Sequence, residues 1–108
     1  MSGLSPFVLV ADEDSLGRLV RALALDPVVA VDTESNSLHA YRERVCLIQV
    51  STLSADYIID PIKLPDLSSL APVFANPDQQ KVFHAADNDL ACLRRDYGFE
   101  FANIFDTM

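Results

Sequence analysis

The sequence contains little cysteine, few basic residues and no long hydrophobic run. Its two cysteines, Cys46 and Cys92, lie far apart and form no Cys-x-x-Cys pair, which favours packed, reduced thiols over a disulfide framework. Lysine and arginine total 8 against 16 aspartates and glutamates, a formal net charge of −8, which argues against binding of nucleic acid by bulk positive charge. The apolar run at residues 7–11 is too short for a signal peptide or a membrane span, so we expect a cytoplasmic protein that does not contact a membrane.

Half of the 108 residues are hydrophobic, which is enough for the core of one domain covering residues 1–108. Short apolar runs predict strands at 7–10, 28–34, 45–50, 57–59, 81–84 and 101–105. Apolar residues at helical spacing predict helices over 14–25, from Pro65 to Asn76, and from Asp87 to Gly98. An antiparallel meander followed by strand–helix alternation is typical of an α/β domain, here with a mixed sheet in three layers.

The central feature is the strand at 28–34, in which four small or β-branched residues lead directly into Asp32-Thr33-Glu34. Because side chains alternate along a strand, Asp32 and Glu34 should point to the same face. Two carboxylates on one face repel each other unless a cation neutralises them, and hard divalent ions prefer oxygen ligands. The alternative is that the strand simply ends and the acidic residues open a solvated loop.

A second acidic segment lies where the strand at 81–84 gives way to a helix. Asp87 is placed as the helix N-cap, and Asp89 falls in the first turn with its side chain near the end of the sheet. The alternative for both carboxylates is that they complement the helix dipole. His84, at the end of the strand, is either part of a functional site or simply a hydrogen-bonded histidine at a strand end.

Several short motifs together carry a resemblance to a known family. Asp32-Thr33-Glu34 resembles the first motif of the DEDD superfamily of 3′–5′ exonucleases, and His84-(x)4-Asp89-Leu90 resembles the second motif of its ribonuclease D branch. The strands of that branch are similar to four further segments, at residues 47–51, 59–61, 81–84 and 105–107. Because the segments occur in the same order and spacing, the resemblance is more specific than Asp-x-Glu alone.

The resemblance implies a ribonuclease H-like fold and two divalent metal ions, Mg²⁺ or Mn²⁺, in an enzyme that removes nucleotides from a 3′ end by hydrolysis. It implies that Asp32 bridges both ions, that Glu34 binds the ion beside the attacking water, and that Asp89 binds the other ion.

The resemblance also implies how the substrate is held. Thr33 and Ser35 would line the pocket of the terminal nucleotide, and His84 would shape the site and approach the substrate. The ribonuclease D branch favours RNA over DNA as the partner, in the form of single-stranded 3′ ends of structured precursors such as tRNA.

One motif of the family is missing from the sequence. A Tyr-x-x-x-Asp motif (His-x-x-x-Asp in another branch) should supply a fourth carboxylate and the group that orients the water. No such motif follows Asp89, since Tyr97 has Phe101 at i+4, and residues 104–108 end the chain without a closing helix. We therefore expect the motif beyond Met108, a C-terminally incomplete exonuclease domain, and weak or no catalysis by these residues alone.

Two other interpretations stay open. A non-catalytic module of the same fold could act as a nucleic-acid or protein scaffold, although a scaffold has no reason to keep Asp32, Glu34 and Asp89 together. A signalling receiver domain would account for the acidic pair that begins at Asp12. However, Asp32 follows Asp12 too closely to be the phospho-accepting aspartate that such a domain requires.

Overall fold

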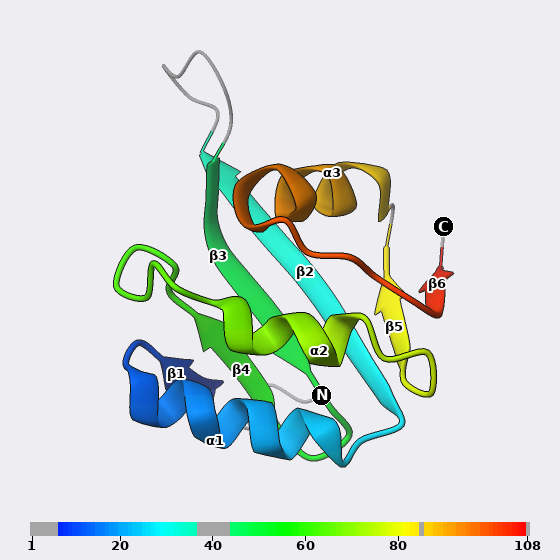
Figure 1. Ribbon diagram of the computed structural model, residues 1–108, viewed down its shortest axis with the longest axis horizontal. Helices are drawn as coiled ribbons and strands as arrows, with labels where there is room; N and C mark the ends of the chain where they lie inside the picture. Colours follow the sequence, from blue (N-terminus) through cyan, green and yellow to red (C-terminus); the bar gives the residue numbers. More distant parts are fainter. Residues whose placement is uncertain (1–6, 37–43, 85, 108) are drawn as a thin grey trace.

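The apolar runs of the sequence form a mixed sheet with the acidic motif on a central strand (Figure 1). The computed structural model describes residues 7–36, 44–84 and 86–107, and their side chains other than those of residues 35, 36 and 44–46. In this part of the chain the sheet has six strands in the order β1-β4-β3-β2-β5-β6. The strands are β1 (Phe7–Val10), β2 (Val28–Asn36), β3 (Arg44–Ser51), β4 (Asp56–Ile59), β5 (Gln80–Phe83) and β6 (Ile104–Asp106). The helices are α1 (Glu13–Ala24), α2 (Ala71–Phe74), which follows the 3-10 turn η2 (Ser68–Leu70), and α3 (Ala86–Tyr97).

Strand directions in the sheet are mixed, as the sequence predicts. Strands β2, β3 and β4 form an antiparallel meander, with Asp32 opposite Gln49 and Ile48 opposite Ile59. The pairs β1–β4, β2–β5 and β5–β6 are parallel. The mixed α/β sheet is therefore confirmed, and the antiparallel meander excludes a receiver domain, which has a parallel doubly wound sheet.

All three labelled helices cover the same face of the sheet in Figure 1. Burial along β2 agrees, because Val29 and Val31 are buried whereas Ala30 and Asp32, which alternate with them, are exposed. We call the other side, on which Ala30 and Asp32 lie and which carries no helix in the described part of the chain, the open face. The described residues thus form the sheet and one helix layer of the three layers that the sequence predicts.

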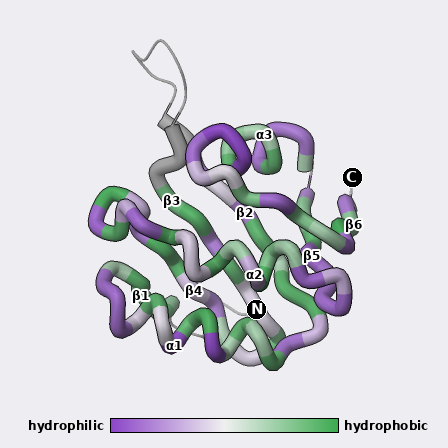
Figure 2. Tube along the Cα trace, viewed as in Figure 1, coloured by the Kyte–Doolittle hydropathy of each residue, from purple (hydrophilic) through white to green (hydrophobic). Residues whose placement is uncertain are grey.

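Helix α1 forms where the sequence predicts an amphipathic helix. Asp12 accepts a hydrogen bond from the backbone N–H of Ser15 at 2.8 Å, and the Ser15 hydroxyl oxygen accepts from the Asp12 N–H at 3.3 Å, which makes a capping box. Leu16, Leu19 and Leu23 recur at helical spacing and are buried in the core. Figure 2 shows the resulting alternation of hydrophobic and hydrophilic residues along α1. No helix within the described ranges is long and apolar enough to cross a membrane.

The helix predicted to open at Pro65 begins later and is shorter. Asp66 Oδ1 accepts the backbone N–H of Ser68 at 3.0 Å, which holds a local turn where the first helical turn was expected. Residues 68–70 then form η2, and α2 covers only residues 71–74. Pro72 has no backbone N–H to donate to Ser68, so a continuous α-helix through this segment would lack a hydrogen bond.

The last strand also begins later than predicted. Phe101, expected in a strand over 101–105, packs into an aromatic cluster, with its ring centroid 4.8 Å from that of Phe74 and 5.5 Å from that of Phe83. Strand β6 begins only at Ile104, after Asn103 with a φ of 60°. Burial of the aromatic ring therefore takes precedence over strand pairing at this position.

Candidate active site

The acidic motif lies on the open face of β2. Asp32 and Glu34 are exposed and alternate with the buried Val31 and the half-buried Thr33. The cross-strand partner of Asp32 is Gln49, and the register shifts only after Glu34. The prediction that both carboxylates point to the same face is therefore confirmed.

Thr33 points to the opposite face, which the helices cover. Its hydroxyl donates a hydrogen bond to Asp89 Oδ1 of α3 at 2.5 Å, across 56 residues of sequence. This contact joins the acidic motif of β2 to the acidic segment at the start of α3. The side chain of Ser35 lies outside the described part of the chain, so a role for Ser35 in the nucleotide pocket stays a prediction.

Asp89 is a buried carboxylate in a repulsive environment. Only 7% of the surface of Asp89 is exposed to solvent. Burial raises the pKa of Asp89 above its usual value, the hydrogen bond from Thr33 partly opposes this rise, and the negative charge of Asp32 adds to it. Asp32 and Asp89 therefore lie close enough for their charges to interact, although they come from different elements.

The donor atoms of this site suit a hard divalent cation, since carboxylate oxygens are the ligands that Mg²⁺ and Mn²⁺ prefer. A cation beside Asp32 and Asp89 would also relieve their repulsion. Within residues 7–36, 44–84 and 86–107, however, no three Asp, Glu, His or Cys side chains are grouped closely enough to hold a metal ion. Asp32 borders a cavity of about 330 Å³, and Glu34 borders a different cavity of about 260 Å³ that shares Gln49 with it. The structure thus joins Asp89 to the strand that carries Asp32 and Glu34 through the Thr33 hydroxyl, and it places these two carboxylates at different cavities.

His84 lies just beyond the end of β5 and borders the same cavity as Asp32. Its Nδ1 atom is 3.0 Å from Thr107 Oγ1. Thr107 in turn donates to the Phe83 carbonyl through its backbone N–H at 2.9 Å and through its hydroxyl at 3.3 Å. His84 is therefore a hydrogen-bonded strand-end histidine, and its ring also borders the cavity beside the acidic motif.

The start of α3 is held from another strand. Asp106 Oδ2, at the end of β6, accepts the backbone N–H of Ala86 at 2.9 Å. Asp87 is exposed within the first helical turn, so its prediction as the N-cap was wrong. The physical reason is that β6 brings a carboxylate to the unpaired N–H groups of the helix start from outside the helix. The sequence analysis did not predict that Asp106 would hold the start of α3 or that Thr107 would contact His84. The sequence signal for these roles was the Asp-Thr pair that follows the last apolar run.

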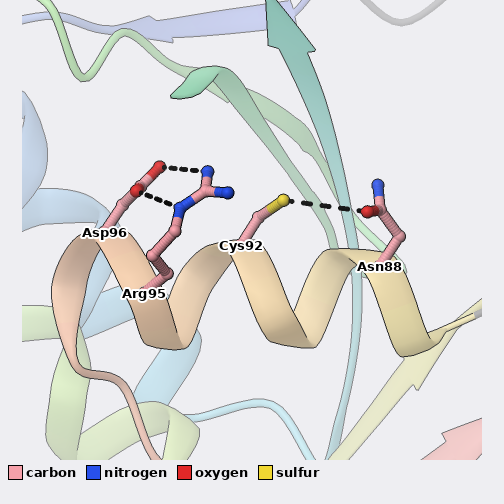
Figure 3. A network of polar contacts seen from close by, with 4 residues as sticks. All are labelled: Asn88, Cys92, Arg95 and Asp96. Atoms are coloured by element: carbon pink, nitrogen blue, oxygen red, sulfur yellow. Dashed lines mark hydrogen bonds and ion pairs between the residues drawn. The ribbon is translucent and has the colours of Figure 1, made fainter. Parts of the chain in front are cut away.

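Farther along α3, Figure 3 shows polar contacts between neighbouring residues of the helix. Cys92 Sγ lies 3.9 Å from Asn88 Oδ1, and Arg95 Nε pairs with Asp96 Oδ1 at 2.8 Å. Gly98 lies at the predicted end of the helix, and its φ of 69° is the left-handed conformation that favours glycine after a helix. Asp89, in the first turn of α3, makes the hydrogen bond to the acidic motif.

Known proteins resemble this chain over nearly all of its length. A family model for 3′–5′ exonuclease domains matches residues 7–108. The chain is 45% identical over 102 residues to Protein RRP6-like 3 of Arabidopsis thaliana, a match that covers 94% of this chain and 11% of that protein. It is 44% identical over 80 residues to the exosome complex exonuclease RRP6 of Saccharomyces cerevisiae, which covers 73% of this chain and 11% of that protein.

Solved structures show the same similarity. The catalytic core of RRP6 from Trypanosoma brucei matches with a TM-score of 0.92 and 37% identity, covering 99% of this chain and 30% of that one. Escherichia coli RNase D matches with a TM-score of 0.87 and 27% identity, covering 94% of this chain and 27% of that one. The chain thus spans 11% of the length of these two curated relatives. The chain belongs to the family of 3′–5′ exonuclease domains, with the ribonuclease H-like DEDD fold of the RRP6 and ribonuclease D type.

Proposed function

We propose that this protein is a metal-dependent exoribonuclease that hydrolyses phosphodiester bonds from the 3′ end of RNA. The observation that carries the proposal is the hydrogen bond from the Thr33 hydroxyl to Asp89 Oδ1, which joins a buried carboxylate of α3 to the strand that carries Asp32 and Glu34. Carboxylates gathered in this way from two elements are favoured by a compensating cation and are typical of a functional site. The family match over residues 7–108 supports the class of reaction.

In this proposal Asp32, Glu34 and Asp89 hold two divalent ions, Mg²⁺ or Mn²⁺. Bound ions would supply the positive charge that a scissile phosphate needs and would lower the pKa of an attacking water. His84 borders the cavity beside Asp32 and would hydrogen-bond the terminal nucleotide, with its ring oriented by Thr107.

The proposed substrate is RNA with a single-stranded 3′ end, in a structured precursor such as tRNA. Support comes from the description of Escherichia coli RNase D as an exoribonuclease involved in structured RNA processing. Because the net charge is −8, bulk positive charge does not account for the attraction of the RNA phosphates. In this proposal the bound metal ions attract them instead. We also propose a cytoplasmic location, because two widely spaced cysteines without a Cys-x-x-Cys pair favour reduced thiols in a reducing compartment.

The first test measures Mn²⁺ binding. The free ion is quantified from its electron paramagnetic resonance signal as protein is added. We expect the protein to bind Mn²⁺ and Asp32→Asn to weaken binding by about tenfold or more. Asp78→Asn, which removes an exposed carboxylate before β5, is the matched control and should bind as the wild type does. Absence of binding, or equal binding by Asp32→Asn, would contradict the proposal and favour a non-catalytic module of the same fold.

The second test is turnover of a 5′-labelled RNA with a single-stranded 3′ end. We expect shortening in one-nucleotide steps that needs Mg²⁺ or Mn²⁺, stops in EDTA and is lost in Asp32→Asn. Because no Tyr-x-x-x-Asp follows Asp89, we expect weak or no turnover by these residues alone, so the assay needs a chain that contains this motif. Faster degradation of a DNA strand of the same sequence would contradict the preference for RNA.

A further inference from the structure

Thr33 is the residue of the acidic motif whose side chain turns toward the helices. Asp32 and Glu34 lie on the open face, whereas Thr33 is half-buried opposite the fully buried Ile48. Its hydroxyl lies between the strand that carries two of the proposed metal ligands and the helix that carries the third. Strand alternation therefore turns the Thr33 side chain toward the helix-covered face, and the packing of α3 on that face brings Asp89 within reach of it.

The contact between Thr33 and Asp89 has the geometry of a strong hydrogen bond. The O···O distance of 2.5 Å is at the short end of the range for a hydroxyl that donates to an ionised carboxylate. Threonine is β-branched, so few rotamers are open to it and its hydroxyl direction is well defined on a strand. The hydrogen bond therefore holds the Asp89 carboxylate in one orientation against β2.

The surroundings of Asp89 make this hydrogen bond necessary. Asp89 is itself almost fully buried, as are Cys92 and Leu93, three and four residues farther along α3. A carboxylate that is removed from water in this way needs a hydrogen-bond donor. Thr33 supplies the donor, and it thereby holds Asp89 against the strand that carries Asp32.

We propose that Thr33 is a positioning residue, whose hydroxyl fixes Asp89 through Oδ1 and leaves Oδ2 as the oxygen that would hold a divalent cation. This inference rests on the proposed function, because it assigns Thr33 a part in assembling the same metal site. The inference also gives Thr33, the middle residue of the motif, a different role from the two carboxylates on either side of it. Asp32 and Glu34 bind from the open face, and Thr33 acts from the helix-covered face.

The test compares two substitutions of Thr33 by their Mn²⁺ affinity. Thr33→Val keeps the shape and the β-branch but removes the hydroxyl, and we expect Mn²⁺ binding about tenfold weaker, as for other residues that orient a ligand. Thr33→Ser keeps the hydroxyl and should bind close to the wild type. In an Asp89→Asn background, Thr33→Val should cause no further loss, because the positioned carboxylate is already gone.

Two controls separate positioning from folding. Thr52→Val removes a threonine hydroxyl that accepts the Ala55 N–H at 3.2 Å in the β3–β4 turn, and Mn²⁺ affinity should not change. Thermal unfolding in EDTA shows whether each variant is folded, and Thr33→Ala replaces Thr33→Val if valine does not fit beside α3.

The outcomes distinguish the inference from the proposed function. If Thr33→Val and Thr33→Ala bind Mn²⁺ as tightly as the wild type while Asp32→Asn does not, the positioning role is wrong and the metal site stands. If Thr33→Ser loses as much affinity as Thr33→Val, strand packing and not the hydroxyl is responsible, and the inference is again wrong. If the wild type does not bind Mn²⁺, both the inference and the proposed function are wrong.

Discussion

Asp89→Asn should stabilise the metal-free protein at pH 7, although it removes a proposed metal ligand. Asparagine has nearly the same shape as aspartate and keeps an oxygen that accepts the Thr33 hydroxyl, but it carries no charge. Burial and the charge of Asp32 raise the pKa of Asp89, so ionisation of this carboxyl lowers the stability of the folded state.

The magnitude follows from two opposing effects. Relief of the burial penalty and of the repulsion from Asp32 should contribute about 1–2 kcal/mol, as for other substitutions that relax a functional site. Loss of a negative charge from the first turn of α3 should lower the free energy of unfolding by about 0.3–1 kcal/mol. We expect a net gain of about 1 kcal/mol, which raises the Tm of a domain of this size by about 4 °C or more.

The pH dependence gives the sign of the effect independently. A carboxyl with a raised pKa contributes stability that is fully present below its unfolded value of 3.8 and is lost as the pH rises through the folded-state value. The advantage of Asp89→Asn should therefore be absent below pH 3.8, grow as the pH rises from 3.8 to the folded-state pKa, and be complete above that pKa. Thermal unfolding in EDTA, followed by circular dichroism across this range, measures it.

Excess Mn²⁺ should reverse the order, because only the wild type gains stability from a ligand that the variant binds poorly. Asp87→Asn is the matched control, since Asp87 is exposed in the same helical turn and its charge favours the helix start. It should lower the free energy of unfolding by about 0.3–1 kcal/mol, the opposite sign to Asp89→Asn. An Asp89→Asn variant that is less stable than the wild type at pH 7 in EDTA would refute the reasoning.

Three further predictions concern the scaffold around the site, each measured by urea unfolding. Lys81 is fully buried and its ammonium donates to two backbone carbonyls at 2.5 and 2.8 Å, so Lys81→Met should lower the free energy of unfolding by about 1–3 kcal/mol. Asp106→Ala should lower it by about 1 kcal/mol, because the Ala86 N–H loses its acceptor, whereas Asp106→Asn should stay closer to the wild type. Leu23→Ala should lower it by about 2–5 kcal/mol, because this fully buried side chain leaves a cavity between α1 and the sheet. A loss below about 1 kcal/mol for Leu23→Ala would show that the core collapses around the smaller residue.

Local sequence patterns were sufficient for the elements that depend on near neighbours. The capping box of Asp12 and Ser15 lies within one turn, and the helix that follows begins within a residue of its prediction. The left-handed cap at Gly98 is likewise a property of one residue. The meander of β2, β3 and β4 follows from short connections between consecutive strands.

Predictions were wrong where a distant residue competed with a local signal. Asp87 is a good N-cap by sequence, but Asp106 arrives from β6 and accepts the first N–H of α3. Phe101 has a high strand propensity, but its half-buried ring packs against Phe74 and Phe83. In both cases tertiary packing overrides a weak local preference, and nothing in the nearby sequence reveals the competitor.

The sequence by itself determined that Asp32 and Glu34 share a face, because side-chain alternation is a property of any strand. Only the tertiary structure decided which neighbour each side chain meets. Thr33 reaches Asp89 across 56 residues because β5 pairs beside β2 and the helix after it returns over the same face. That contact depends on how the chain closes on itself, which no local pattern encodes.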